Sequence, residues 1–227
     1  MDIYYSPNKL NAQQFHLLMK DISTIEYYKG QWDVLHPRGG NPPETMLKIN
    51  AGIKEESEIE DRETRIARAI FEILLEFHSD PDKFILSPNM IKSLHYKLFL
   101  YSPVDAQHRG NFRCDLSEGL NGICEMLVGH INNKNMHIIL SVSIFRHEFL
   151  ELMPFIAANT QLANLLSYFL LVQNDYSFIA HLPFLAYMSG ANTWLSKEHP
   201  FMLPHAIAHV LKHSQNGRSE IYLNRRR

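Results

Sequence analysis

The apolar segment from Ala158 to Val172 constrains the fold of this chain more than any other part of the sequence. Few of its residues are polar on any face of a helix, so it should form a helix with neighbours on all sides. Elsewhere apolar residues recur at helical spacing, and no stretch alternates with period two for more than a few residues. The pattern predicts an all-α protein, a bundle around this central buried helix.

Start and stop residues place the other helices. Ser87-Pro88 pairs a helix cap with proline at the first helical position, and Ser117 is expected to cap a helix that the turn at Asn132-Asn133 ends. Proline and glycine from Pro37 to Pro43 indicate a loop. Besides 158–172, the expected helices are 15–25, 66–77, 90–100, 117–132, 136–152, 182–188 and 204–213.

The chain of 227 residues is long enough for one large domain or two small ones. We expect one compact domain in three parts: an N-terminal helical extension (residues 1–86), a core (87–190), and a C-terminal helix and tail (191–227). Cys114 and Cys124 form neither a disulfide framework nor a four-ligand zinc site, so we expect both to be buried small hydrophobes.

Charge and hydropathy argue against several classes of function. Lys+Arg 22 against Asp+Glu 24 give a formal net charge of -2, so no overall field draws the protein to nucleic acid or to an anionic membrane. The longest apolar stretch, Leu165 to Val172, is far shorter than the roughly 20 residues of a membrane span. Because the first residues do not form a signal peptide, we expect a cytoplasmic protein, or one exported without a Sec signal.

A family resemblance begins in the segment from Phe149 to Leu171, which reads FLELMPFIAANTQLANLLSYFLL. The segment resembles the signature of the Fic/Doc (Fido) family, F-x-x-(I/L)-H-P-F-x-x-G-N-(G/K)-R-x-x-R, followed by a leucine-rich helix. Pro154, Phe155 and Asn159 match the signature.

Two upstream segments extend the resemblance. Ile91 to Phe99 is similar to the family's helix before a G-x-(F/Y)-R turn, and Gly110-Asn-Phe-Arg113 matches that turn. The resemblance covers about Ser87 to Tyr187 and implies a Fic-like helical bundle for the core. It also implies transfer of AMP, or another phosphate-containing group, from a nucleotide to a protein hydroxyl.

The positions that carry the family's chemistry hold other residues in this chain. In the family a His removes the hydroxyl proton, glycines let backbone N–H groups approach the phosphates, arginines clamp phosphate oxygens and an acidic residue holds Mg²⁺. A thioether cannot accept the proton, and neutral side chains supply no charge. The His position falls on Met153, the acidic residue on Ala157, the glycines on Ala158 and Thr160, and the arginines on Gln161 and Asn164.

A second departure concerns the flap. The family places a β-hairpin after the G-x-(F/Y)-R turn, and this hairpin holds the target segment by strand addition. Only Cys114-Asp-Leu116 separates Arg113 from Ser117, which is too short for a hairpin.

The leading hypothesis is a catalytically impaired Fic-fold protein that binds another protein, or a nucleotide-like ligand, in the altered pocket. The alternative is an active nucleotidyl or phosphoryl transferase with a non-standard site, in which Arg146, His147 or a later His lies over the Pro154-Phe155 turn. ATP and Mg²⁺ would be its cofactors.

Three histidines suggest a third function. His205, His209 and His213 follow one another at four-residue spacing on one expected helix, and two His at that spacing can bind zinc. The stripe would make the protein a metal-binding or pH-responsive module, whereas its ordinary interpretation is a solvated or half-buried helix face.

Overall fold

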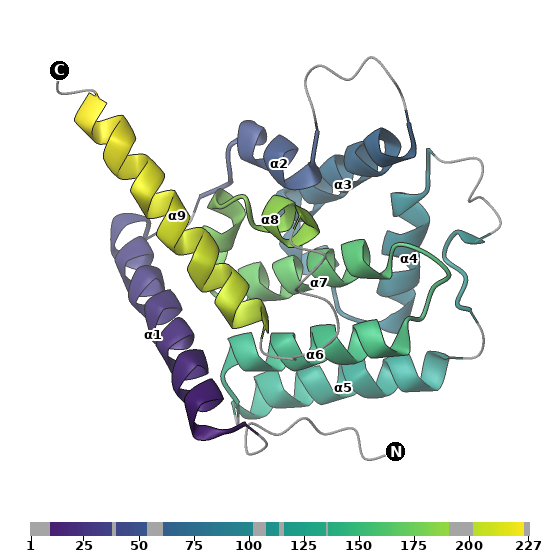
Figure 1. The fold of residues 1–227 in the computed structure, drawn as a ribbon. Coiled ribbons are helices and arrows are strands. Elements are labelled where there is room, and N and C mark those ends of the chain that lie inside the picture. Colours follow the sequence, from purple (N-terminus) through teal and green to yellow (C-terminus); the bar gives the residue numbers. More distant parts are fainter. Residues whose placement is uncertain are drawn as a thin grey trace.

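The computed structural model describes residues 10–37, 40–53, 61–101, 108–113, 116–134, 136–190 and 202–224, with side chains in the last range only as far as Ser214. Every regular element in these ranges is a helix, so the predicted all-α class is confirmed. The elements are α1 (Ala12–Leu35), α2 (Glu44–Ala51), α3 (Arg62–Ser79), η2 (Pro81–Lys83), α4 (Pro88–Leu98), α5 (Ser117–Asn133), α6 (Ile138–Leu152), α7 (Asn159–Gln173), η4 (Ser177–His181), α8 (Phe184–Gly190) and α9 (Met202–Asn224) (Figure 1).

The predicted central helix is α7, which lies in the middle of the bundle with the other helices around it (Figure 1). All its residues from Leu162 to Leu171 are buried. The Ser167 hydroxyl lies within this run and donates to the Ala163 carbonyl at 2.8 Å, so the helix itself satisfies it. The ring of Phe169 stacks on Phe77 of α3 with the centroids 4.2 Å apart.

Most of the expected helices form, with shifted ends. The Ser87 side chain accepts a hydrogen bond from the Met90 N–H, so the predicted cap of α4 is confirmed. The predicted cap of α5 is wrong by one position, because Leu116 precedes the helix and Ser117 is its first residue. The helix expected from 136 begins at Ile138, where the His137 imidazole accepts the Ile139 N–H.

Helix α2 was not expected from the sequence, and it ends at Gly52 with a φ of 78°. Glycine adopts this left-handed conformation without strain, which makes it the usual residue after a helix. Asn50, buried in α2, joins this short helix to the segment around α8. Its Nδ2 donates to the Leu182 carbonyl at 2.9 Å, and its Oδ1 accepts the Leu185 N–H at 2.8 Å.

One apolar core connects the two ends of the chain with its middle. Ile25 of α1, Leu166 of α7 and Leu211 of α9 belong to the same cluster of buried residues. α9 packs along α1, and both lie beside the helices of the central part (Figure 1). Burial of this kind is the main favourable term in folding. In the described ranges, no helix is long and apolar enough to cross a membrane.

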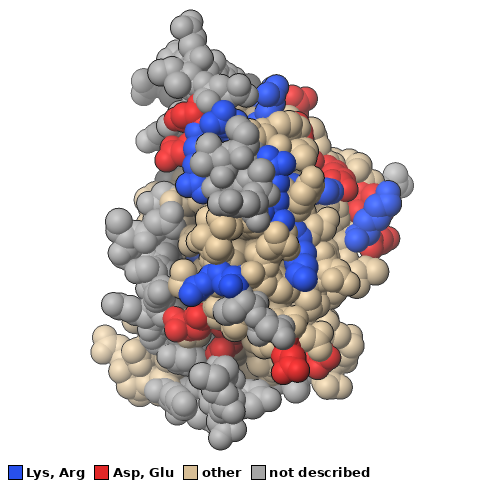
Figure 2. Space-filling model, turned by 90° about the vertical axis from the view of Figure 1, so that its right-hand side faces the viewer, with Lys and Arg blue, Asp and Glu red and all other residues tan. Residues whose placement is uncertain are grey.

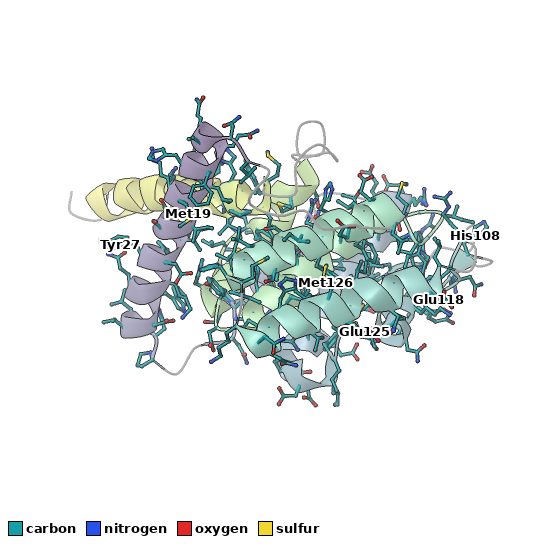
Figure 3. The ribbon with its side chains drawn as sticks, turned by 90° about the horizontal axis from the view of Figure 1, so that it is seen from below. Met19, Tyr27, His108, Glu118, Glu125 and Met126 are labelled. Carbon is teal, nitrogen blue, oxygen red and sulfur yellow. The ribbon has the colours of Figure 1, made fainter. Side chains whose placement is uncertain are left out.

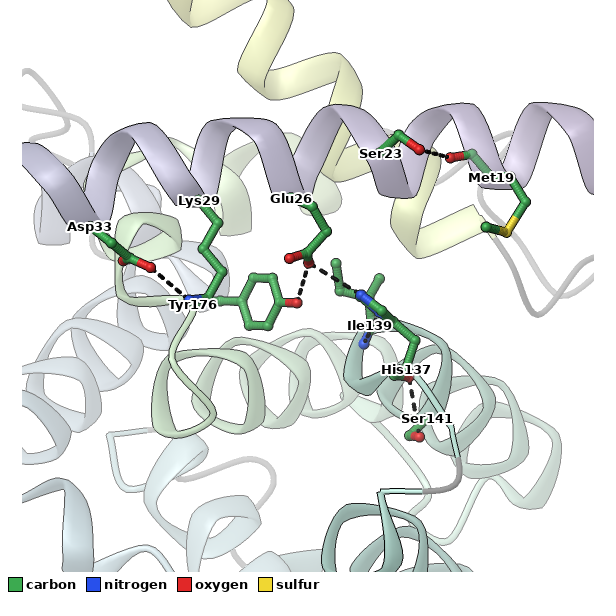
Figure 4. Close-up of polar contacts among 9 residues, drawn as sticks. All are labelled: Met19, Ser23, Glu26, Lys29, Asp33, His137, Ile139, Ser141 and Tyr176. Atoms are coloured by element: carbon green, nitrogen blue, oxygen red, sulfur yellow. Dashed lines mark hydrogen bonds and ion pairs between the residues drawn. The ribbon is translucent and has the colours of Figure 1, made fainter.

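Polar contacts also hold α1 against the rest of the molecule. Glu26 accepts a hydrogen bond from the Tyr176 hydroxyl, and its Oε1 lies 3.2 Å from His137 Nε2 (Figure 4). Farther along the helix, Asp21 Oδ2 lies 3.1 Å from Nδ1 of His205 on α9. Two carboxylates of α1 therefore each face an imidazole from another part of the chain, one from the cap of α6 and one from α9.

The outer surface of α1 carries apolar side chains in water. Met19 and Tyr27 are 42% and 67% exposed, and Tyr27 lies on the side of α1 away from α5 and α6 when the molecule is seen from below (Figure 3). Met126 of α5 is partly buried and packs in a small second cluster with Leu18 and Ile22 of α1. Cys124 is buried, as expected, whereas Cys114 lies outside the described residues.

Candidate functional site

The loop that joins α6 to α7 carries the residues that resemble the family signature. α6 ends at Met153, whose φ of 43° and ψ of 61° are left-handed, and whose N–H donates to the Phe149 carbonyl at 3.0 Å. Ala158, directly before α7, is left-handed as well, with a φ of 59°. An L-residue adopts this conformation at a cost, which the surrounding contacts must outweigh.

Asn159 closes the loop with both ends of its amide. Its Oδ1 accepts the Phe155 N–H at 3.0 Å, and its Nδ2 donates to the Phe155 carbonyl at 2.7 Å. Asn159 and Phe155 are both buried, so these backbone groups have no access to bulk water. Asn159, which matches the family signature, therefore has a structural role, because its side chain bonds the backbone of the loop.

The helix α4 supports the loop from the side. The imidazole of His95 stacks on Phe155 with ring centroids 3.9 Å apart and an interplanar angle of 6°. Its Nδ1 accepts the Gly110 N–H at 3.0 Å, which leaves the proton on Nε2, 3.2 Å from the Ala157 carbonyl oxygen. His95 is therefore held in one tautomer, between the loop and the turn at Gly110.

The turn at 108–113 docks on the same loop. The Arg113 N–H donates to the Pro154 carbonyl at 2.8 Å, and the ring of Phe112 lies 5.1 Å from that of Phe155. Lys92 Nζ of α4 lies 4.4 Å from the Phe112 ring centroid. The turn and α4 lie at the right-hand side of the molecule in Figure 1. Figure 2 views the molecule from that side and shows Lys and Arg side chains gathered on part of this face.

The positions of the family's chemical groups lie on and beside this framework. Met153 is half-buried at the end of α6, and the Ala157 side chain supplies no oxygen, although Mg²⁺ prefers oxygen ligands. The residues at these motif positions therefore do not fit a magnesium ion. Ala158 gives α7 no side-chain cap, and Thr160 is half-buried in the first turn.

Gln161 and Asn164, at the family's two arginine positions, line a pocket of about 370 Å³. Helices α2, α3, α7 and α8 form its walls, with Ile66, Ile70 and Leu185 among the apolar lining residues. The volume lies within the range of small-molecule sites. The described lining residues include no Lys or Arg, and their polar members are Asn50, Glu63, Gln161, Asn164 and Ser189.

A buried cation lies behind the pocket wall. The guanidinium of Arg146 on α6 donates from Nε at 3.2 Å and from Nη2 at 3.1 Å, both times to Asn164 Oδ1. Arg146 is only 7% exposed, and burial lowers its pKa to about 10, so it stays protonated at neutral pH. The Nδ2 of Asn164 is buried and has no hydrogen-bond partner in the described residues.

The three histidines His205, His209 and His213 do not share one set of contacts. His205 faces Asp21 of α1, whereas His209 Nε2 and His213 Nε2 lie 3.1 Å apart. In the described ranges, no group of three or more His, Cys, Asp or Glu residues is arranged to hold a metal ion. The structure therefore brings together two of the three residues and places the third on another partner.

Two contacts of the site were not expected from the sequence. The segment containing His95 was included in the resemblance, but its stack on Phe155 depends on the approach of α4 to the loop. Arg146 was named only as a residue that could lie over the Pro154-Phe155 turn, and it instead lies buried beside Asn164. The available signal was an arginine that directly follows the largely apolar first half of this helix.

Comparison with known proteins identifies the fold. No protein-family model matches the sequence, and no curated protein matches it. Among solved structures, the chain is similar to the crystal structure of a Fic family protein from Desulfovibrio desulfuricans G20, with a TM-score of 0.65 and 15% sequence identity. The likeness covers 95% of this chain and 78% of that one, and it shows that this chain has a Fic-like fold.

Proposed function

We propose that this chain is a Fic-fold binding protein without transferase activity, which recognises a partner protein or a nucleotide-like ligand at the pocket beside α7. One observation carries the proposal. Hydrogen bonds from Asn159, His95 and Arg113 hold the backbone of the loop. The positions of the family's chemistry carry Met153, Ala157, Gln161 and Asn164 instead.

Transfer to a hydroxyl needs a base within hydrogen-bond reach of the proton. Met153 offers a thioether, which does not serve as a base near neutral pH. His95 contacts the loop, but its Nδ1 already accepts the Gly110 N–H and its Nε2–H faces the Ala157 carbonyl. Its imidazole is 1% exposed, so neither nitrogen is available to a substrate hydroxyl.

The composition of the pocket favours a ligand group without a large negative charge. A nucleoside triphosphate is usually held by Arg, Lys or Mg²⁺. The described lining offers the neutral amides of Gln161 and Asn164 and the carboxylate of Glu63. The pocket is thus suited to a polar, uncharged part of a ligand or to a side chain of a partner protein.

A transfer assay tests the proposal. The purified chain is incubated with Mg²⁺ and with ATP labelled in the α- or γ-phosphate, alone and with a cell lysate. We expect no label on the chain alone, and no labelling of the lysate beyond that of the same lysate without the chain. Labelling that disappears when Met153 is changed to Ala would contradict the proposal. A matched change at the neighbouring exposed Ile156 controls for damage to the loop.

Arg146 is the observation that favours the alternative, a transferase with relocated groups. Its guanidinium lies against Asn164, at the family's second arginine position, so a positive charge remains near α7. If the protein were such an enzyme, Arg146→Gln would abolish labelling while the protein stayed folded. Under our proposal there is no labelling for that change to remove.

A further inference from the structure

The side chains of His209 and His213 face each other across one turn of α9. Their Nε2 atoms lie 3.1 Å apart, and the ring centroids are separated by 4.2 Å with an interplanar angle of 42°. His213 is exposed and His209 half-buried, so the space between the two nitrogens can be reached from solvent. Without a ligand, the distance fits one ring donating its N–H to the lone pair of the other.

The same distance fits a chelated metal ion. Imidazole nitrogens bind Zn²⁺ at about 2.0–2.1 Å, and two such bonds from atoms 3.1 Å apart meet at an angle of about 100°. That angle lies between the 90° of square-planar or octahedral ions and the tetrahedral angle, so chelation needs little movement of either ring. We propose that His209 and His213 form a two-histidine site for a divalent transition metal such as Cu²⁺, Ni²⁺ or Zn²⁺.

The contacts of His209 prepare it for this role. Its ring stacks on Tyr187 of α8, with centroids 5.1 Å apart at 26°, and its Nδ1 is buried. The orientation of the ring is therefore fixed by packing, with Nε2 as the nitrogen directed at His213. Burial, and to a smaller extent the nearby His213, His205 and Lys212, lower the pKa of His209, so its imidazole is neutral at neutral pH.

The third histidine of the stripe does not belong to the site. His205 Nδ1 lies 3.1 Å from Asp21 Oδ2, where it connects α9 to α1. Two protein ligands leave the remaining coordination positions to water. Imidazole ligands favour Cu²⁺ over Zn²⁺ and disfavour Mg²⁺ and Ca²⁺, which prefer oxygen.

The test is a calorimetric titration of the full chain with Cu²⁺ and with Zn²⁺, repeated on His209→Gln and His213→Gln. Because the helix presents the second imidazole at a high effective concentration, each change should weaken the first equivalent of metal by about 10²-fold. The metal should also raise the melting temperature of the natural chain, and this rise should be lost in both variants. His205→Gln is the matched control, and it should retain both the affinity and the rise in melting temperature.

Three results would contradict the proposed two-histidine site. They are tight binding that survives His213→Gln, an equal loss in His205→Gln, and no stoichiometric binding of Cu²⁺ by the natural chain. If His209→Gln disturbs the packing on Tyr187, circular dichroism will reveal it, and the exposed His213 then decides the question alone. The result is independent of whether the pocket beside α7 binds a ligand.

Discussion

Asn159 should matter for stability, because its amide closes the α6–α7 loop. In Asn159→Ala, the Phe155 N–H and carbonyl lose their partners at 3.0 and 2.7 Å while they stay buried. An orphaned buried polar group costs about 1–3 kcal/mol, so the two together should lower the free energy of unfolding by about 2–6 kcal/mol. In a chain of this size, that loss corresponds to a fall in melting temperature of about 4–24 °C.

The assay is urea unfolding followed by circular dichroism, with thermal melting as a second measure. Thr160→Ala is the matched control, because Thr160 is the next residue of the same helix turn and should change stability by less than about 0.5 kcal/mol. If Asn159→Ala cost no more than the control, the amide would not be closing the loop, and the structural role assigned to Asn159 would be wrong.

Two further predictions concern pH and backbone conformation. Burial, and secondarily the nearby His181, lower the pKa of His78 from 6.5 to about 4. Between these values the unfolded chain binds the extra proton, so the free energy of unfolding should fall as the pH drops from 6.5 to 4. The fall should be at most about 3 kcal/mol, because solvent screens the half-buried imidazole. Urea unfolding of His78→Gln that showed the same fall would refute this. Gly110 has a φ of 66°, and a Cβ there would lie 3.2 Å from the Lys92 carbonyl, so Gly110→Ala should lower the melting temperature. In contrast, a Cβ at Gly122 of α5 would meet open space, so Gly122→Ala should raise the free energy of unfolding by about 0.5–1 kcal/mol. Equal effects of the two changes would contradict the left-handed, crowded conformation of Gly110.

The sequence predicted the parts of the fold that depend on local pattern. The segment 158–172 has few polar residues on any face of a helix, and the structure confirms it as the central helix α7. Ser87-Pro88 was recognised because a cap and an N1 proline act within one helical turn. Helix α2 was missed because eight residues carry too little periodicity to stand out beside a loop rich in proline and glycine.

The contacts of the site depended on residues far apart in the chain. The His95 stack on Phe155 and the Arg113 bond to Pro154 arise only when α4 and the following turn approach the loop. The spacing of His205, His209 and His213 predicted that the three side chains share one face of a helix. In the structure His205 contacts Asp21 of α1, so it does not act together with His209 and His213. Patterns along one helix predict which residues share a face, and tertiary packing decides what each of them contacts.

Central to our proposal, the pocket beside α7 lies in a Fic-like fold, and its described lining residues lack the positive charges that hold a nucleoside triphosphate. The most direct test of the proposal is a calorimetric titration of ATP, with and without Mg²⁺, into the natural chain and into Gln161→Arg and Gln161→Met. Gln161 lines the pocket, so an arginine there should add a cation where the family has one, while Met keeps the size and neutrality of the side chain.

We expect no heat from the natural chain or from Gln161→Met up to millimolar ATP, and measurable binding by Gln161→Arg. Tight binding of ATP by the natural chain, unchanged in Gln161→Met, would contradict the account.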